Sequence, residues 1–390
     1  IRSFGDDPVR VASMVSRYVS TIQSFGVMAV AKHFPGHGDT SIDSHLDLPS
    51  VDVDMNTLLN RELIPFKAAV DSGVSCIMTS HVSFPNIDPS RLPATFSSII
   101  LRDILRGMLG FNGVIISDAL EMKAISGRFD VRDVASYGLK AGLDIFLRCF
   151  DFDYIFDLKD SIIRFVNNGL ISRDRIYESF KRIENLRGRF NLPSIMDPIY
   201  KVPLENLRRN RYLSHKVSLA AVTVNNGDLL KPLGIFGSLA ILIPKNLERF
   251  LSNFNPEVVS LFVNEFGADI GTMVVTVYDE NISIDDVLDV VLNVDGVLFF
   301  TYNAIFNKYQ LDLYEKIKDR VSVIVIAGLP YDANFISDKK PIIFTYGLNT
   351  ISLSALVDVL CGSHIAGGGL PVKLNFSSIC GTSPSHMHSL

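Results

Sequence analysis

The stretch from Lys32 to His45 concentrates side chains that can exchange protons: three histidines, two aspartates and one lysine. An aspartate that hydrogen-bonds an imidazole fixes its tautomer and stabilises its protonated form, which makes the histidine a competent general acid and base near pH 7. Asp43 and His45 lie two positions apart, and we expect them to form such a pair. A polar surface loop, with Asp43 in a simple Asx turn, is the structural alternative.

Asp118 is the candidate nucleophile. It directly follows the apolar run 113–117, where a carboxylate needs a solvated cleft or hydrogen-bond donors because its burial without a partner is costly. A carboxylate nucleophile with a separate proton donor is the minimum set of groups for a retaining glycosidase, and a cation such as Lys32 would suit a hydroxyl-rich sugar. The structural alternative is that Asp118 caps the next helix.

Other chemistries have weaker support from residue spacing. The side chains that could bind a metal are His33, His37, Asp39, Asp43 and His45. They are separated by a Pro-Gly break and do not share a helix face, so we predict no metal site. Ser44 and His45 lack the sharp turn around a nucleophilic serine, and Gly367–Gly369 lacks the lysine of a phosphate-binding loop and is expected to form a turn.

Short apolar runs predict the strands that position these groups. The runs span residues 27–33, 74–79, 113–117 and 143–147. Helical periodicity between and after them predicts helices from Pro8 to Gly26 and over about 56–72, 98–109, 131–141, 153–168 and 173–187. Wholly apolar strands that alternate with helices are typical of parallel sheets covered on both faces.

Polar residues occur at the C-terminal ends of these predicted strands, at Lys32-His33, Ser80-His81 and Ser117-Asp118. In a (β/α)8 barrel the carboxyl ends of the strands carry the active site. Four strands are predicted before residue 150, so the other half of a closed barrel would precede Ile1. We therefore expect residues 1–190 to form the C-terminal part of a (β/α)8 catalytic barrel.

Residues 191–212 lose the periodicity and are expected to form a linker. Alternation resumes in 213–380, which predicts a second, open α/β domain, and residues 381–390 are expected to be a tail. Its predicted strands are 221–224, 240–243, 273–277, 296–301, 321–327 and 342–346, and its predicted helices are 246–253, 284–292, 305–319 and 350–361.

Bulk properties exclude some functions. The net charge is −5 and no basic stripe is present, which argues against a nucleic-acid partner. No apolar run approaches the roughly 18 residues of a membrane span. The four cysteines form no CxxC pair and no zinc spacing. The chain starts at Ile1 without methionine and reads as a piece or a processed product, so the compartment (cytoplasm, cell envelope or outside the cell) and the oligomeric state stay open.

Three segments resemble glycoside hydrolase family 3, and in particular its β-N-acetylglucosaminidases of the two-domain type. They are the segment from Lys32 to Pro49, the segment Val114–Met122 around Asp118, and the segment Arg2–Pro8. The second domain resembles that of the same members at 327–332, 345–347 and 368–371.

The resemblance implies a role for six residues. Asp118 would be the nucleophile, and His45, partnered by Asp43, would be the acid and base. Arg2, Lys32 and His33 would bind the sugar. The implied reaction is exo-hydrolysis, with retention, of terminal β-linked N-acetylglucosamine from peptidoglycan fragments or chitooligosaccharides, a small carbohydrate substrate, and no metal or organic cofactor is implied.

Two other functions stay open from the sequence. A family 3 β-glucosidase-like exo-glycosidase typically lacks the short Asp-Ser-His loop and takes its acid and base from a carboxylate elsewhere. A sugar-binding, catalytically inactive remnant is the alternative from outside the enzymes, because the first half of the barrel does not occur in the 390 residues. Arg148 also places a bulky group at a strand end where smaller groups are expected beside a sugar.

Overall fold

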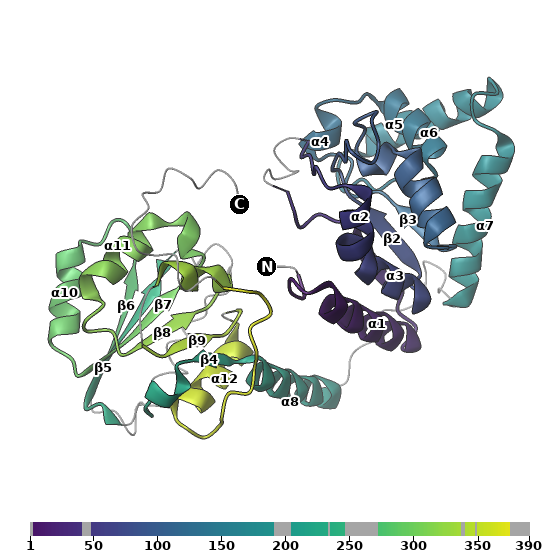
Figure 1. Cartoon of the computed structure of the whole chain (residues 1–390). Helices are drawn as coiled ribbons and strands as arrows, with labels where there is room; N and C mark the ends of the chain where they lie inside the picture. The colour runs from purple at the N-terminus through teal and green to yellow at the C-terminus, as the bar shows by residue number, and fades with distance from the viewer. Residues whose placement is uncertain are drawn as a thin grey trace. The chain divides into compact units, whose positions relative to one another are not determined.

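The structure is a computed structural model that describes residues 3–40, 48–190, 204–232, 235–245, 272–336, 340–347 and 349–374. These residues divide into two compact units (Figure 1). We call residues 4–190 the N-terminal unit and residues 204–374 the C-terminal unit. None of the described helices is long and apolar enough to cross a bilayer.

A parallel sheet forms the centre of the N-terminal unit. Its strands β1 (Val30–Phe34), β2 (Cys76–Thr79) and β3 (Val114–Ile116) lie in the order β1-β2-β3. Ile145 forms a parallel bridge to Ile116 and occupies the next position. The predicted alternation of parallel strands and helices is confirmed here, with one difference: among the described residues the predicted strand 143–147 is reduced to this bridge.

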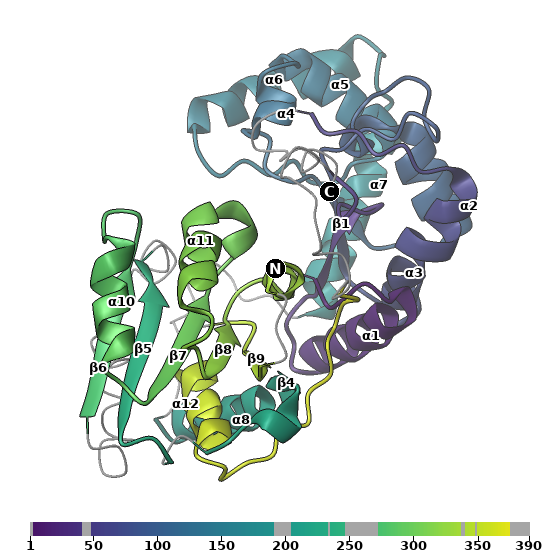
Figure 2. The same ribbon diagram turned by 60° about the vertical axis from the view of Figure 1, so that its left-hand side comes forward.

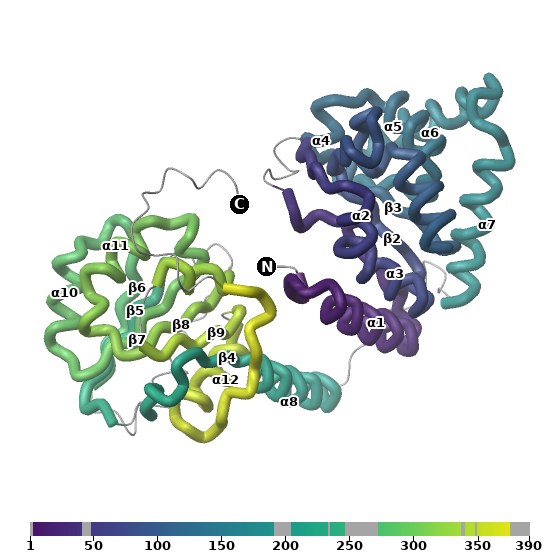
Figure 3. The backbone as a smooth tube through the Cα atoms, viewed as in Figure 1, coloured from purple at the N-terminus to yellow at the C-terminus, as the bar shows by residue number. Residues whose placement is uncertain are grey.

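Helices and short turns link these strands. They are α1 (Pro8–Ser24), α2 (Met55–Thr57), η1 (Leu58–Glu62), α3 (Leu63–Asp71), η2 (Ala94–Phe96), η3 (Ile99–Met108), α4 (Lys123–Ser126), α5 (Val131–Ala141), α6 (Phe152–Asn167) and α7 (Arg173–Arg189). Helices α1 and α3 pack side by side, as the backbone trace shows (Figure 3). The Asp7 carboxylate caps α1 by accepting from the amides of Val9 and Arg10, with Pro8 in the first turn, as the Asp-Pro pair predicts.

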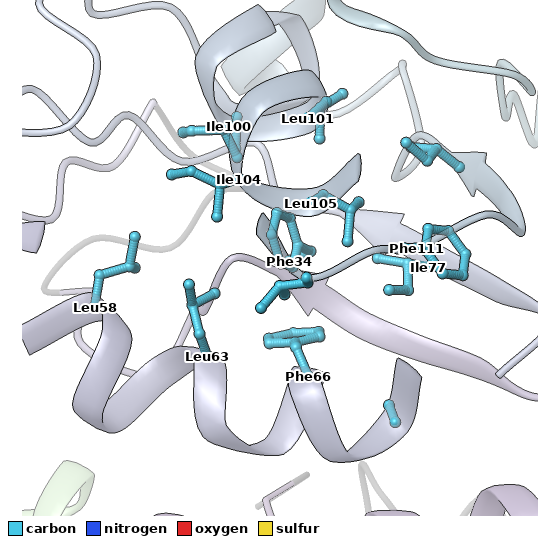
Figure 4. Close-up of a cluster of buried hydrophobic side chains, with 14 of the residues drawn as sticks. Phe34, Leu58, Leu63, Phe66, Ile77, Ile100, Leu101, Ile104, Leu105 and Phe111 are labelled. Atoms are coloured by element: carbon cyan, nitrogen blue, oxygen red, sulfur yellow. The ribbon is translucent and has the colours of Figure 1, made fainter. Parts of the chain in front are cut away.

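The largest core of this unit lies between the sheet and the helices on one of its faces. Phe34, Ile77 and Ile115 come from the three strands, and all three are fully buried. They pack against apolar side chains of α3 and η3, including Phe66 and Leu105 (Figure 4). Burial of this apolar surface holds the strands, and therefore the loops at their carboxyl ends, in fixed positions.

A buried carboxylate ties the amino-terminal side of the sheet to two helices. The Asp144 side chain is fully buried and accepts from Arg106 of η3 at 2.7 Å and from Arg182 of α7 at 3.0 Å. Arg175 lies 3.7 Å from the same carboxylate, and its NH1 group donates to Ser179. Burial lowers the pKa of Arg106 to about 10 and also lowers that of Arg175, and the Asp144 charge opposes both shifts.

The C-terminal unit is an open α/β sheet with the strand order β4-β9-β8-β7-β5-β6. Its strands are β4 (Thr223–Asn225), β5 (Ser238–Pro244), β6 (Thr272–Tyr278), β7 (Gly296–Thr301), β8 (Val323–Ile326) and β9 (Ile342–Phe344). Its helices and turns are α8 (Leu204–Ala221), η4 (Gly227–Leu229), α10 (Ile284–Leu292), η7 (Ala304–Phe306), α11 (Lys308–Ile317), η8 (Pro330–Phe335) and α12 (Thr350–Leu360).

All pairs in this sheet are parallel except β4 with β9. Helix α12 packs on one face, while α10 and α11 pack on the other (Figure 2). Successive residues of β7 alternate between the two cores, so both neighbours Leu298 and Phe299 are fully buried. The predicted second open α/β fold is confirmed, although the predicted helix 246–253 lies outside the described residues.

Two segments of the C-terminal unit refine the sequence predictions. Residues 204–212 were expected to belong to the linker, but they are helical and form the start of α8. Helix α8 packs against α12, and His215 Nε2 lies 2.9 Å from Asp358 Oδ2. The domain boundaries themselves stay a prediction. Gly368 belongs to a close backbone contact: its amide donates to the Val222 carbonyl at 3.0 Å, and a Cβ there would lie 2.5 Å from the Ala221 carbonyl oxygen.

Candidate active site

The carboxyl ends of β1, β2 and β3 lie next to one another because the three strands are parallel and adjacent. His33 lies near the end of β1, His81 follows β2, and Asp118 follows β3. The amide of Ser80 donates to the Phe34 carbonyl at 2.8 Å, which continues the pairing of the first two strands toward this edge. The edge thus gathers titratable groups from three separate segments.

Each oxygen of the Asp118 carboxylate has a close polar contact. Its Oδ1 accepts from the amide of Ala119 at 2.8 Å, and its Oδ2 lies 3.3 Å from His33 Nε2. The side chains of Asp118 and His33 keep 19% and 17% of their surface exposed, so the carboxylate is held in place and still reachable. The alternative in which Asp118 caps the next helix is wrong, because helix α4 begins only at Lys123.

The residues around His33 come from the same strand and the turn that follows it. The His37 ring stands edge-on to the His33 ring, with 5.6 Å between ring centres. Lys32 is exposed on β1. Asp39 accepts from Arg61 at 2.7 Å, which anchors the turn to the end of η1.

Three of the predicted site residues, Arg2, Asp43 and His45, lie outside the described residues. Of the six, the structure therefore places Lys32, His33 and Asp118, and it brings His33 and Asp118 into contact. The alternative metal site also includes Asp43 and His45, so its full ligand set lies partly outside the described residues.

His81 is a residue to which the sequence assigned no role. It is 1% exposed, its Nδ1 lies 2.8 Å from Thr95 Oγ1, and its Nε2 lies 3.1 Å from the Ala119 carbonyl oxygen. Burial lowers the pKa of His81 to about 4, although the Asp118 carboxylate and the carbonyl of Ala119 act in the opposite direction. The position of His81 after an apolar strand was the one sequence feature that could have indicated a role. Its hydrogen-bond partners could not be predicted, because they come from other segments of the chain.

The segment after Ile145 is bonded to the residue that precedes Asp118. The Leu147 amide donates to Ser117 Oγ at 2.8 Å, directly beside Asp118 in the chain. Arg148 contacts the segment that follows it: its guanidinium donates to the Phe150 carbonyl and to Asp151, and it lies 4.0 Å from the centre of the Tyr154 ring. These contacts explain how a long side chain fits at this strand end.

Glu121 adds a second carboxylate to this loop. Its Oε1 accepts from the Cys149 amide at 3.1 Å, which links the loop after β3 to the segment after Ile145. Hydrogen bonding to Glu121 and, to a smaller extent, burial raise the pKa of the Cys149 thiol. The contact fixes the far end of the segment that carries Asp118.

Comparison with known proteins finds similarity to one family. Residues 1–186 match the N-terminal domain of glycosyl hydrolase family 3. The β-hexosaminidase A of Pseudoalteromonas piscicida is 32% identical over 255 residues, which cover 60% of this chain and 42% of that protein. A β-hexosaminidase of Xanthomonas campestris pv. campestris is 40% identical over 148 residues, which cover 38% of this chain and 44% of the relative.

The fold of both units is similar to that of a solved family 3 β-N-acetylglucosaminidase from Paenibacillus, with a TM-score of 0.82 and 29% identity over 95% of this chain and 72% of that one. The chain spans less than half the length of the two curated relatives named above. Similarity to the family therefore extends from the sequence around Asp118 to the fold that positions it. Residues 1–186 are thus similar to the N-terminal domain of glycosyl hydrolase family 3, and the fold of the chain is similar to that of a solved enzyme of this family.

Proposed function

We propose that the protein is a retaining exo-glycosidase that hydrolyses terminal, non-reducing β-linked N-acetylglucosamine from peptidoglycan fragments or chitooligosaccharides. The observation that carries this proposal is the Asp118 carboxylate, which follows a buried strand, remains partly exposed and is held by Ala119 and His33. The relatives named β-hexosaminidase and β-N-acetylglucosaminidase support the substrate class.

The first step forms a covalent intermediate. A carboxylate oxygen of Asp118 attacks the anomeric carbon, the bond from that carbon to the leaving oxygen breaks, and protonated His45 gives its proton to the leaving oxygen. Contacts with His33 and the Ala119 amide orient the carboxylate for this attack.

The second step releases the sugar. His45, now neutral, takes a proton from water, and the resulting oxygen nucleophile attacks the anomeric carbon while the ester bond to Asp118 breaks. Asp43 fixes the His45 ring and stabilises its charged form. Two inversions at one carbon give net retention. Arg2, Lys32 and His33 bind the sugar hydroxyls and the acetamide.

The test is the release of 4-nitrophenol from its N-acetyl-β-glucosaminide by the full-length protein. Asp118→Ala should abolish this release, because in the proposed mechanism Asp118 is the group that forms the ester bond. Asp103→Asn is the matched control: it alters an exposed aspartate of η3 and should leave the rate unchanged. Undiminished turnover by Asp118→Ala would sink the assignment.

The choice of glycoside separates the alternatives. Faster release from the β-glucoside than from the N-acetyl-β-glucosaminide would identify a β-glucosidase-like enzyme. No release from either, by protein with Asp43, His45 and Asp118 intact, would identify a sugar-binding protein. Addition of phosphate distinguishes hydrolysis from phosphorolysis, because only the latter yields a sugar phosphate.

A further inference from the structure

His81 is the buried titratable group at this edge that the proposed chemistry does not use. It follows β2, which lies between β1 and β3 in the sheet. Its side chain is too deeply buried to reach a substrate. A buried imidazole needs a partner for each polar nitrogen, and these partners show what the residue does.

The partners decide which nitrogen carries the proton. The Ala119 carbonyl can only accept a hydrogen bond, so His81 Nε2, 3.1 Å away, must be the donor. In the neutral ring Nδ1 then accepts, and the Thr95 hydroxyl at 2.8 Å is its donor. The Thr79 hydroxyl lies 2.8 Å from Thr95 Oγ1, and the Thr95 hydroxyl also lies 3.1 Å from the Ser80 carbonyl oxygen, a second acceptor for its proton.

This assignment requires an uncharged ring, and the surroundings of His81 favour one. Burial lowers its pKa to about 4, His37 acts in the same direction, and Asp118 with the Asp118 and Ala119 carbonyls acts against it. At neutral pH the ring is therefore neutral. Thr79 and Thr95 are fully buried as well, so water does not compete for the Thr95 hydroxyl next to the imidazole.

The same residue that His81 binds also binds the nucleophile. The Ala119 amide donates to Asp118 Oδ1 at 2.8 Å, and the Ala119 carbonyl accepts from His81. We propose that His81 is a positioning residue for Asp118: its Nε2–H group fixes the Ala119 carbonyl, and thereby the backbone whose amide orients the attacking carboxylate. The inference rests on the proposed role of Asp118 as the nucleophile.

A positioning role predicts which kinetic constant changes. Loss of the His81–Ala119 bond loosens the carboxylate and slows its attack, while the sugar contacts of Lys32 and His33 remain. The rate constant for formation of the glycosyl-enzyme should fall and KM should stay within about twofold. A merely structural histidine would instead lower the melting temperature without this division between kcat and KM.

Two amide variants make the comparison. Gln places a nitrogen near the position of His Nε2, whereas Asn is one carbon shorter and does not reach the Ala119 carbonyl. We expect His81→Asn to slow formation of the glycosyl-enzyme by about tenfold or more and His81→Gln to restore most of the rate. Thr95→Val removes the donor to Nδ1 and should give an intermediate loss. Equal rates in the Asn and Gln variants would overturn the inference.

A second readout does not depend on activity. Hydrogen exchange of the peptide that contains Ala119 should speed up in His81→Asn and remain near the wild-type rate in His81→Gln. In the wild-type protein, ¹⁵N NMR should show His81 neutral and protonated at Nε2 at pH 7, and this holds even if His81→Asn does not fold. A ring protonated at Nδ1 contradicts the inference. The wild-type protein could also be inactive while the exchange and NMR results hold. That outcome would contradict the proposed function but would still establish that His81 positions Ala119.

Discussion

His33 Nε2 lies 3.3 Å from Asp118 Oδ2, and this contact joins the ends of β1 and β3 across the intervening strand β2. Each of the two residues lies in a segment whose sequence resembles that of the family. A predicted sugar-binding residue, His33, is thus also in contact with the predicted nucleophile. His33 is therefore expected to act on both binding and chemistry.

Substitution of His33 should reduce both kinds of function. His33→Ala removes a donor from the Asp118 carboxylate, and a hydrogen bond to a charged group contributes about 1.5–3 kcal/mol, which corresponds to a loss of roughly ten- to a hundredfold in kcat/KM. Steady-state kinetics on 4-nitrophenyl N-acetyl-β-glucosaminide measures this loss. The control is Asn86→Ala, which removes a donor to the Asp52 carbonyl at an exposed position and should leave kcat/KM unchanged. An unchanged kcat in His33→Ala would contradict a role in orienting Asp118.

Acid should destabilise the fold through His81. Its pKa is lowered from an ordinary value of 6.5 to about 4, so between these values the unfolded chain binds more protons than the folded protein. Stability is then fully present above pH 6.5 and decreases as the pH falls toward 4, by on the order of 3 kcal/mol. Urea unfolding at a series of pH values measures this decrease.

His81→Gln is the variant that isolates this contribution, because glutamine does not titrate. The pH dependence of its unfolding free energy should be flatter than that of the wild-type protein between pH 6.5 and 4. Asp118 and His37, which act on the same imidazole, are present in both proteins, so the comparison isolates the contribution of His81. Parallel pH curves for the two proteins would show that His81 is not buried in a neutral form.

The Asp144 cluster should be a major source of stability in the N-terminal unit. Asp144→Asn leaves Arg106, Arg175 and Arg182 around a neutral group, and the loss of one partner from a buried ion pair costs about 3–5 kcal/mol. Urea denaturation gives the change in unfolding free energy. The matched control is Asp160→Asn, whose exposed pair with Lys159 should contribute less than about 1 kcal/mol. Equal effects of the two substitutions would contradict this account.

Predictions from the sequence succeeded where one local pattern decided the structure. Strand β3 is wholly apolar and β2 is apolar up to Thr79, and both occur where the sequence predicts them. The Asp-Pro start of α1 and the position of Asp118 directly after β3 were readable for the same reason, because each depends on neighbours in the chain. A residue that follows a buried strand can be assigned to the functional edge of a sheet without knowledge of its contacts.

Contacts between distant segments were not readable from the sequence. The roles of His81 depend on Thr95 and Ala119, which belong to other segments. Arg148 turns away because Asp151 and Tyr154 bind it after the chain reverses. Helix α8 shows the same limit of local patterns: it extends through residues 204–212, which lack clear periodicity, because packing on α12 stabilises it.

The most direct test of the central claim is to trap the sugar on its nucleophile. A fluorinated N-acetylglucosaminide that slows the second step should leave the sugar attached to the protein, and mass spectrometry of its peptides identifies the modified residue. If Asp118 is the nucleophile, we expect one modified residue, Asp118, and no modified residue in Asp118→Ala. A sugar attached to a different residue, or turnover of the unfluorinated substrate by Asp118→Ala at the wild-type rate, would contradict it.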